Sequence, residues 1–320
     1  MASARNATGT SSGGLGVFGR ILGSSPARTR EALWGYFFLL PWLLGLVIFV
    51  VGPIIASFGL SFTEYSILGT PKFVGPQNYV QAFTKDDLLW PSVGRTFVYA
   101  AAIVPLGVIG SLILAILLNQ KLVGTAFYRT LFFMANLIPV VASAILWIWV
   151  LQPKVGPVNY LLGTVGIQGP GWLGSPDWAL PSVIMIGLWG SLGGQRMIIF
   201  LAGLQGVPQE LYEAADIDGA SQWNKFRNVT LPMISPTMLF NVILGVIGAL
   251  QVFNIAYVAT AGGPSYATWF FALHIYRQAF EYFRMGYGSA LAWLFAIMLL
   301  VFTYIQMRTS NRWVYYAGEK

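Results

Sequence analysis

Five polar side chains lie within stretches of the sequence that are otherwise apolar. They are Arg196, Asn241, Gln251, Asn254 and Tyr257. Planar amides and an aromatic ring are the groups that recognise a sugar, because amides bind its hydroxyls and a ring packs against its C–H face. The chain offers no convergent set of buried titratable groups of the kind that an enzyme uses. The first interpretation is therefore that these residues line a pathway for a polar ligand.

Each of these residues also has a second interpretation. A charge within a membrane span costs roughly 2.5 to 3.5 kcal/mol unless it is paired or hydrated. Arg196 therefore either donates to the hydroxyls or to an anionic group of a substrate, or it bonds a neighbouring helix or the cytoplasmic headgroups. The spacing of Asn241, Gln251 and Asn254 places them within about one quadrant of a helix, with Tyr257 nearby. Such a stripe either lines a pathway or holds helices together in lipid.

The composition excludes several kinds of catalytic site and leaves structural roles for other notable residues. The sequence has no Cys and a single His, His274, which excludes thiol nucleophiles, disulfides and Cys/His zinc sites. We expect His274 to be a structural imidazole and Asp86 and Asp87 to be a solvated pair in a loop. Gly190 and Gly194 form a Gly-x-x-x-Gly pair, which is typical of closely packed helices.

The elements that position these residues are predicted to be membrane-spanning helices. Of the 320 residues, 56% are hydrophobic and 9% are charged, whereas soluble domains carry roughly 25% charged residues. Apolar stretches long enough to cross about 30 Å of hydrocarbon run over 34–62, 96–118, 130–151, 180–204, 237–258 and 287–305. Only the fourth contains a charge, Arg196. The sequence predicts an all-α, polytopic integral membrane domain over residues 28–320 with six spans in a lipid bilayer, preceded by a disordered cytoplasmic tail over 1–27.

Lys and Arg residues are distributed unevenly between the two sides of this predicted domain. Of the 18 in the chain, Arg196 lies in a span, six lie on one side and eleven lie on the other. The eleven are Arg5, Arg20, Arg28, Arg30, Lys121, Arg129, Lys225, Arg227, Arg308, Arg312 and Lys320. Cytoplasmic segments carry the excess of positive charge, so we expect both termini in the cytoplasm. No basic cluster is interleaved with aromatic residues, and nucleic acid is not an expected partner.

The cytoplasmic segment over 205–236 has the pattern of a folded hairpin. Pro208 is suited to the start of a helix, and Asp218-Gly219 is a strong turn signal. Apolar residues then recur at three-residue spacing until Pro232, which is expected to end a second short helix. The sequence predicts a helix-turn-helix at the membrane surface. This hairpin either seats in the groove of a partner or lies at the interface with no partner.

A signature motif in this hairpin carries a family resemblance. Glu213-Ala214-Ala215, three residues, Gly219, nine residues, Val229, one residue and Leu231-Pro232 follow one another. The segment resembles the signature EAA loop of permease subunits of binding-protein-dependent ABC importers, of the carbohydrate-uptake type. Further matching stretches lie over 73–79, 129–133, 201–205, 260–264 and 279–287. Residues 134–139, MANLIP, depart from the family, which brings its proline closer to the preceding aromatic pair.

The resemblance implies the fold of a type I ABC importer transmembrane domain, in the compact form of maltose or glycerol-phosphate permeases that lack a large external insertion. It implies that the loop docks on an ATPase through Glu213, Ala214, Ala215, Asp218, Gly219, Ala220, Leu231 and Pro232. The implied partners are a second permease subunit in a heterodimer, two ATPase subunits and an extracytoplasmic solute-binding protein, in a bacterial or archaeal inner membrane. The chain has no Gly-Lys dipeptide and hence no P-loop. We therefore expect no cofactor on this chain, with ATP and Mg²⁺ on the partner ATPase.

We expect this subunit to move a sugar or related polyol inward by alternating access. Two other classes of protein stay open. A secondary, ion-coupled transporter normally carries acids within its spans, whereas all 11 Asp and Glu here lie outside the predicted spans except Glu64 at an edge. A membrane-embedded enzyme would need the convergent titratable groups that the sequence does not offer.

Overall fold

The computed structural model describes residues 26–67, 69–120 and 123–316. The predicted tail over 1–27 lies outside these residues, except that Pro26 and Ala27 begin the first helix. The chain divides into two units, the first ending at Gly59 and the second beginning at Leu60.

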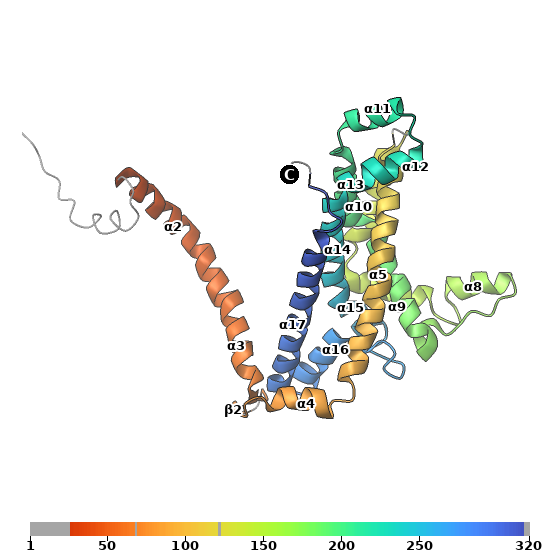
Figure 1. Cartoon of the computed structure of the whole chain (residues 1–320). Coiled ribbons are helices and arrows are strands. Elements are labelled where there is room, and N and C mark those ends of the chain that lie inside the picture. Colours follow the sequence, from red (N-terminus) through yellow and green to blue (C-terminus); the bar gives the residue numbers. More distant parts are fainter. Residues whose placement is uncertain (1–25, 68, 121–122, 317–320) are drawn as a thin grey trace, which may run out of the picture. The chain divides into compact units, whose positions relative to one another are not determined.

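The first unit is a continuous apolar helix, drawn in red and orange in Figure 1. It consists of α2 (Pro26–Leu46), the π-helical turn η1 (Val47–Val51) and α3 (Gly52–Ser61), whose last two residues belong to the second unit. Apolar side chains occupy all its faces rather than one stripe, which is typical of a helix surrounded by lipid or protein. The helix predicted over 34–62 is therefore confirmed.

The second unit is built around the 30-residue helix α5 (Leu89–Leu118). This helix packs against α9 (Pro176–Leu192), α10 (Gly194–Gln205) and α14 (Ser235–Leu250). Glycines allow the close approach: a Cβ at Gly110 would lie 2.2 Å from Cδ2 of Leu192, and one at Gly187 would lie 2.4 Å from the Tyr99 hydroxyl oxygen. Buried apolar side chains of these four helices form one continuous core.

Shorter elements complete the second unit. Where α5 begins lie an antiparallel hairpin, β1 (Thr63–Glu64) and β2 (Lys72–Phe73), with Thr63 opposite Phe73 and Glu64 opposite Lys72, and helix α4 (Gln77–Lys85). The other elements are α6 (Thr125–Met134), the 3-10 turn η2 (Ala135–Leu137), α7 (Val140–Val150), α8 (Pro157–Thr164), the 3-10 turn η3 (Trp172–Gly174), α11 (Gln209–Ile217), α12 (Gln222–Lys225), the π-helical turn η4 (Phe226–Thr230), α13 (Leu231–Met233), α15 (Asn254–Ala259), α16 (Phe271–Tyr276), the π-helical turn η5 (Arg277–Glu281) and α17 (Met285–Ser310).

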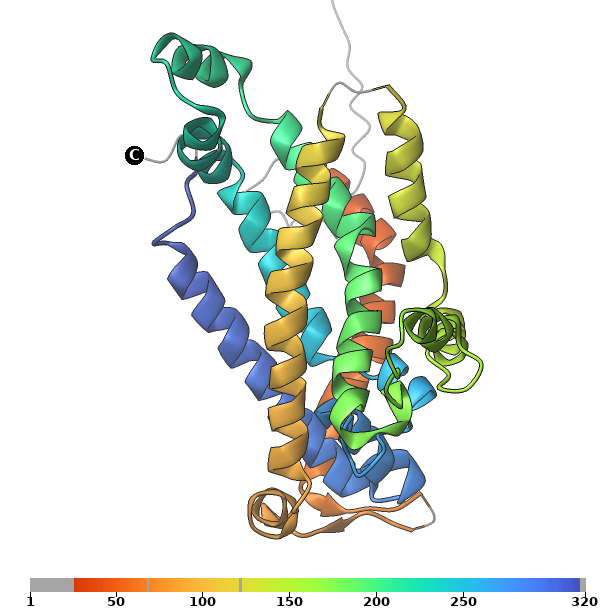
Figure 2. The same cartoon turned by 90° about the vertical axis from the view of Figure 1, so that its right-hand side faces the viewer.

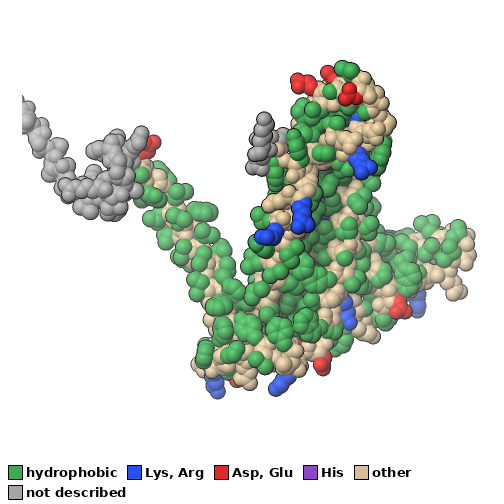
Figure 3. Space-filling model, in the orientation of Figure 1, with side chains coloured by type: hydrophobic (Ala, Val, Ile, Leu, Met, Phe, Trp, Pro, Cys, Tyr) green, Lys and Arg blue, Asp and Glu red, His purple; other side chains and the backbone are tan. Residues whose placement is uncertain are grey.

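The second unit has two polar ends with an apolar surface between them. Figures 1 and 2 place α11 and α12 at one end, here called the hairpin end, and α4 at the opposite end, here called the α4 end. Charged side chains gather towards these ends, and apolar side chains dominate the surface between them (Figure 3). The backbone N–H of Tyr315 donates to Oγ of Ser235 at 2.8 Å. The end of the described chain therefore lies beside the start of α14, near the hairpin end.

Within the described residues, four helices are long and apolar enough to cross a membrane, and two bent pairs bring the number to six if each pair is one span. The stretch predicted as one span over 130–151 is not straight, because α6–η2 and α7 meet at 95°. Pro139 lacks an N–H and disfavours helical geometry at the residue before it, and Ile138 accordingly has ψ 126°. The break falls within residues 134–139, the segment that departs from the family pattern.

The span predicted over 180–204 also bends, by 43° between α9 and α10. Gly194 adopts φ +63°, a left-handed conformation that glycine tolerates. The Oγ of Ser111 on α5 donates to the carbonyl oxygens of Ser191 and Leu192, at 3.0 and 2.9 Å. This side chain satisfies carbonyl groups that the break withdraws from the helix, as a bilayer requires.

The span predicted over 237–258 is confirmed as Ser235–Ala259, but its helix is interrupted. The helix α14 ends at Leu250, and α15 begins at Asn254, so residues 251–253 separate two helical segments. Gln251 is the C-cap of α14, and its N–H donates to the carbonyl of Ile247 at 3.2 Å, whereas Asn254 lies beyond the break and does not continue the helical face on which Asn241 lies. The stretch Ser235–Ala259 still has the length and hydropathy of one span.

Candidate functional site

The first candidate site is a cavity of about 220 Å³ at the junction of α9 and α10, here called the Arg196 cavity. Arg196 and Asn241, which the sequence analysis selected, line it together. Asn136 from η2 and Gln195 from the first turn of α10 also line it. With Ser191 of α9, five hydrogen-bonding side chains from four segments of the chain are thus brought to one place in the apolar part of the bundle.

The guanidinium of Arg196 lies against glycines of two other helices. A Cβ at Gly107 of α5 would lie 2.4 Å from Nη1, and one at Gly245 of α14 would lie 3.3 Å from Nη2. Nη1 is buried and has no hydrogen-bond partner among the described residues, and no carboxylate in that part of the chain forms an ion pair with Arg196. Arg196 therefore faces the interior of the helix bundle as an uncompensated cation.

The second candidate site is an adjoining cavity of about 300 Å³, here called the amide cavity. Gln251 and Asn254 line it, together with Tyr99, Trp189 and Phe253. Asn136 and Gly190 line both cavities, so the two are neighbours. Tyr257 lies beside this site rather than among its lining residues: its ring stacks on that of Phe253 with centroids 5.3 Å apart and an interplanar angle of 16°.

Asn136 and Trp189 were not predicted from the sequence as site residues. Asn136 lies in the MANLIP segment, where an isolated amide in an apolar stretch beside a proline was an available signal. Trp189 carries no such signal, since tryptophan is also common at membrane interfaces. Within the described residues Gly190 does not have the packing role predicted for it, because a Cβ there would meet none of their atoms within 4 Å. At Gly194 the glycine serves the bend, and a Cβ there would lie 2.7 Å from Asn136.

The predicted helix-turn-helix is confirmed as α11, a turn and α12. The N–H of Ala220 donates to the carbonyl of Ala215 at 2.9 Å, and the N–H of Gly219 donates to the carbonyl of Asp216 at 3.0 Å. With φ +70° at Gly219, this is a Schellman motif, in which a left-handed glycine ends a helix. The second segment does not end at Pro232 as expected, because this proline lies in the first turn of α13, where its missing N–H costs nothing.

Two side-chain contacts join the arms of the hairpin. Lys225 pairs with Asp216, and the hydroxyls of Tyr212 and Thr230 lie 2.9 Å apart. Of the residues predicted to contact an ATPase, Glu213, Ala214, Asp218 and Gly219 are exposed, whereas Ala215, Ala220, Leu231 and Pro232 are half-buried. Three large apolar residues of the hairpin are also exposed: Leu211 at 39%, Ile217 at 87% and Trp223 at 66%.

The α4 end contains a buried polar cluster that contradicts one expectation. Asp86 is not solvated: its Oδ2 accepts hydrogen bonds from Nε2 of His274 at 2.8 Å and from the hydroxyl of Tyr287, and its side chain is 9% exposed. Nδ1 of His274 accepts from the indole N–H of Trp269 at 3.1 Å. Burial alone would raise the pKa of Asp86, but these hydrogen bonds and the neighbouring imidazole lower it to about 2. His274 has the structural role predicted for it, while Asp87 is exposed.

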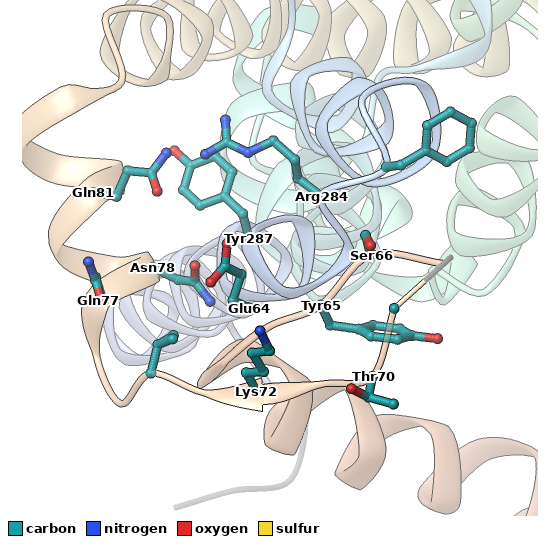
Figure 4. Close-up of a pocket in the computed structure, with 13 residues that line it drawn as sticks. Glu64, Tyr65, Ser66, Thr70, Lys72, Gln77, Asn78, Gln81, Arg284 and Tyr287 are labelled. Carbon is teal, nitrogen blue, oxygen red and sulfur yellow. The ribbon is translucent and has the colours of Figure 1, made fainter.

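Beside this cluster lies a polar cavity of about 570 Å³ (Figure 4). Figure 4 shows Glu64 and Lys72 from the β-hairpin, Asn78 from α4 and Arg284 from the start of α17 around it. Nδ2 of Asn78 donates to the carbonyls of Ser61 and Thr63 at 2.8 and 2.9 Å. This amide fixes α4 to the chain segment that enters β1, so the cavity has a constrained wall.

Comparison with known proteins identifies the family. Residues 107–314 match the family described as "binding-protein-dependent transport system inner membrane component". The probable ABC transporter permease protein YesP of Bacillus subtilis is 39% identical over 295 residues, covering 91% of this chain and 94% of that protein. The trehalose/maltose transport system permease protein MalF of Thermococcus litoralis is 33% identical over 292 residues, covering 90% of this chain and 97% of that protein.

A solved structure shows the same fold. It is that of a bacterial alginate ABC transporter in complex with an alginate pentasaccharide-bound periplasmic protein, and the matching chain has a TM-score of 0.80 at 23% sequence identity. The match covers 89% of this chain and 96% of that chain. Together with the family match and the curated relatives, this likeness confirms the predicted all-α ABC permease fold. The chain belongs to the family of binding-protein-dependent transport system inner membrane components, the permease subunits of ABC transporters.

Proposed function

We propose that this chain is the pore subunit of an ATP-driven ABC importer that carries a sugar or related polyol inward by alternating access. The observation that carries the proposal is the pair of adjoining cavities lined by amides within the apolar bundle. Gln251 and Asn254 offer donors and acceptors to hydroxyls, and the ring of Trp189 offers a surface to a C–H face. The name of the trehalose/maltose permease relative supports the same class of cargo.

The breaks in three spans support a transport role for these cavities. In a bilayer, non-helical backbone is tolerated only where it is buried in protein or lines a water-filled cavity, and discontinuous helices form the substrate sites of many transporters. Here the cavities adjoin the breaks at residues 135–139, 193 and 251–253. Neither cavity is lined by a described Asp or Glu, so the ion-coupled alternative gains no support from them.

The proposal assigns ATPase docking to the α11–α12 hairpin. Its exposed Glu213 and Ala214, and the exposed apolar side chains of Ile217 and Trp223, suit contact with another protein. The helix α10 begins at the Arg196 cavity and ends at Gln205, four residues before α11 begins at Gln209. A displacement of the hairpin by a docked ATPase would therefore be passed along α10 to the cavity.

The remaining assignments follow from the same proposal. A second permease subunit completes the pathway, two ATPase subunits bind ATP and Mg²⁺ and dock at the hairpin ends, and a solute-binding protein delivers cargo at the α4 end. Both termini lie in the cytoplasm, as the distribution of Lys and Arg favours. The cavity in Figure 4 then opens on the side from which cargo arrives.

Uptake by proteoliposomes tests the proposal. The assembly of this chain with its partner permease, ATPase and binding protein is reconstituted, and uptake of a panel of labelled saccharides and polyols is measured with and without internal ATP. We expect ATP-dependent uptake that Asn254→Ala and Gln251→Ala each reduce by about tenfold, because each removes a hydrogen-bonding group from the cargo. Asn311→Ala, which removes an exposed amide outside both cavities, is the matched control.

The possible outcomes separate the two interpretations of the amides. Reduced uptake at normal abundance and normal thermal stability supports the pathway. Reduced stability with unchanged uptake per assembled molecule would assign Gln251 and Asn254 to helix packing instead. An assembly that hydrolyses ATP but takes up no saccharide or polyol would refute the proposed cargo class.

A further inference from the structure

We infer that the Arg196 cavity binds an anionic group of the cargo, so that the transported saccharide is an acidic one. This inference rests on the proposed function above and specifies the chemical class of its substrate. The observation behind it is the cationic side chain that lines the pathway cavity without an acidic partner in the described part of the chain.

Two other basic side chains of the described residues are paired with acids. Lys225 pairs with Asp216, and Arg277 pairs with Glu281 at 2.5 Å. Arg196 has no such partner among the described residues, and its Nη1 is a buried donor without an acceptor. A guanidinium remains protonated inside a protein, so burial cannot remove this charge. An anionic ligand group is the chemistry that would both pair the charge and accept from its donors.

The surrounding helices keep space for this charge instead of neutralising it. The nearest backbone positions on α5 and α14 are Gly107 and Gly245, where any side chain would meet the guanidinium. A structural arginine that ties helices together would be expected to donate to the neighbouring backbone or side chains, whereas Nη1 has no acceptor. The arrangement fits a group that is held in place for a ligand.

Neutral hydrogen-bonding groups surround the charge. Asn136, Gln195 and Asn241 line the same cavity as Arg196. The cavity also lies at the first turn of the 12-residue helix α10, whose positive end adds to the potential of the guanidinium. A carboxylate in this cavity would therefore find a bidentate cationic donor and amide donors together.

The two adjoining cavities suggest how an acidic saccharide would be divided between them. The Arg196 cavity offers charge, whereas the amide cavity offers Gln251, Asn254 and an indole ring. Asn136 lines both and would contact the junction. A cargo with a carboxylate on one unit and neutral hydroxyls on the next matches this order of groups, while a wholly neutral sugar leaves the Arg196 charge unpaired.

Matched pairs of saccharides test the inference in the reconstituted transporter. The pairs are digalacturonate with digalactose, diglucuronate with cellobiose, and dimannuronate with mannobiose. Since one charge-assisted hydrogen bond corresponds to about tenfold or more in affinity, we expect at least one acid to be taken up about tenfold faster than its neutral counterpart. Arg196→Gln should reduce that ratio by about tenfold, and Arg196→Lys should retain part of it.

A second arginine of the bundle provides the matched control. Arg95 on α5 also has a buried Nη1 without a partner in the described chain, but it does not line the Arg196 cavity. Arg95→Gln should therefore leave the acid-to-neutral ratio unchanged. If Arg196→Gln does not assemble, the dimethyl ester of the preferred acid removes the charge from the ligand instead, and its uptake by the unmodified transporter should fall by about tenfold.

The results that would overturn the inference differ from those that would overturn the importer proposal. Neutral sugars taken up as fast as their acidic counterparts, or an acid-to-neutral ratio that Arg196→Gln leaves unchanged, would overturn the acidic cargo and leave a sugar importer standing. Equal uptake of the acid and its ester would have the same meaning. Absence of ATP-dependent uptake of every saccharide by an intact, ATP-hydrolysing assembly would overturn both.

Discussion

Gly219 is the residue at which the geometry of the α11–α12 hairpin can be tested most directly. Its φ of +70° is the left-handed conformation that ends α11, and a Cβ built on it would meet no atom of the described residues within 4 Å. The cost of a side chain at this position therefore arises from the backbone and not from steric overlap within the chain. An alanine in this conformation costs about 1–2 kcal/mol, a β-branched valine costs about 3 kcal/mol, and asparagine costs less because it tolerates left-handed geometry.

These costs translate into the population of the folded hairpin. A change of 1–2 kcal/mol alters an equilibrium about 5- to 30-fold. We expect Gly219→Ala to lower cargo-stimulated ATP hydrolysis moderately, Gly219→Val to lower it strongly and Gly219→Asn to keep most of it. Amide hydrogen exchange over residues 209–225 should be fastest in Gly219→Val, slower in Gly219→Ala and slowest of the three in Gly219→Asn. The reason is that the Schellman hydrogen bonds from Gly219 and Ala220 hold this turn.

The asparagine variant separates a conformational requirement from a steric one. Measurements in nanodiscs would record ATP hydrolysis, retention of the ATPase on purification and hydrogen exchange for each variant. If Gly219→Asn loses the ATPase although its hydrogen exchange is normal, the partner and not the backbone excludes a side chain there. If Gly219→Val matches the unmodified protein in all three measurements, the reasoning from the positive φ is wrong.

Three further predictions concern other parts of the molecule. The pKa of Asp86 is lowered from 3.8 to about 2 in the folded protein. The ionised carboxylate therefore contributes about 2 kcal/mol to the free energy of unfolding above pH 4, and this contribution is lost towards pH 2. The thermal unfolding temperature should change less between these pH values in Asp86→Asn than in the unmodified protein. Asp216→Ala should increase hydrogen exchange in the hairpin more than Lys225→Met does. It leaves Lys225, whose side chain is only 10% exposed, without its partner, whereas the carboxylate left by Lys225→Met is 63% exposed. Hydrogen exchange of the double variant should resemble that of Lys225→Met. In this Cys-free chain, a Cys at Lys85 should react with an impermeant maleimide in intact cells and a Cys at Asn311 only after permeabilisation; the reverse pattern would refute the cytoplasmic termini.

The hairpin could be predicted from the sequence because its signals are local. Pro208, Asp218 and Gly219 each specify the conformation of their own few residues, and the structure contains the expected helix, turn and helix. The apolar stretches likewise predicted helices by composition alone. Pro232 was misinterpreted because a proline is compatible with the first turn of a helix as well as with the end of one.

The buried cluster at Asp86 could not be predicted, because its partners are distant in the sequence. His274 lies 188 residues from Asp86 and Tyr287 lies 201 residues away. Two consecutive aspartates in a loop have the local pattern of a solvated pair, and only the packing of α17 against α4 and of α16 against α5 brings the partners of Asp86 to it. The positions of Gly107 and Gly245 beside the Arg196 guanidinium could not be predicted for the same reason, since glycines in an apolar span carry no sign of what they face.

The breaks in the spans explain why the polar residues could be predicted from the sequence but their common position could not. The polar residues were found individually, as exceptions in apolar stretches, but their common place depends on where each helix stops. Pro139 stops α6–η2 beside Asn136, the glycines at 193 and 194 turn the chain before Arg196, and α14 ends just before Gln251. Backbone groups freed at such breaks must be satisfied inside the protein, so breaks and polar side chains are stable at the same depth. The amide cavity lies at one such place: Gln251 and Asn254 line it at the break between α14 and α15.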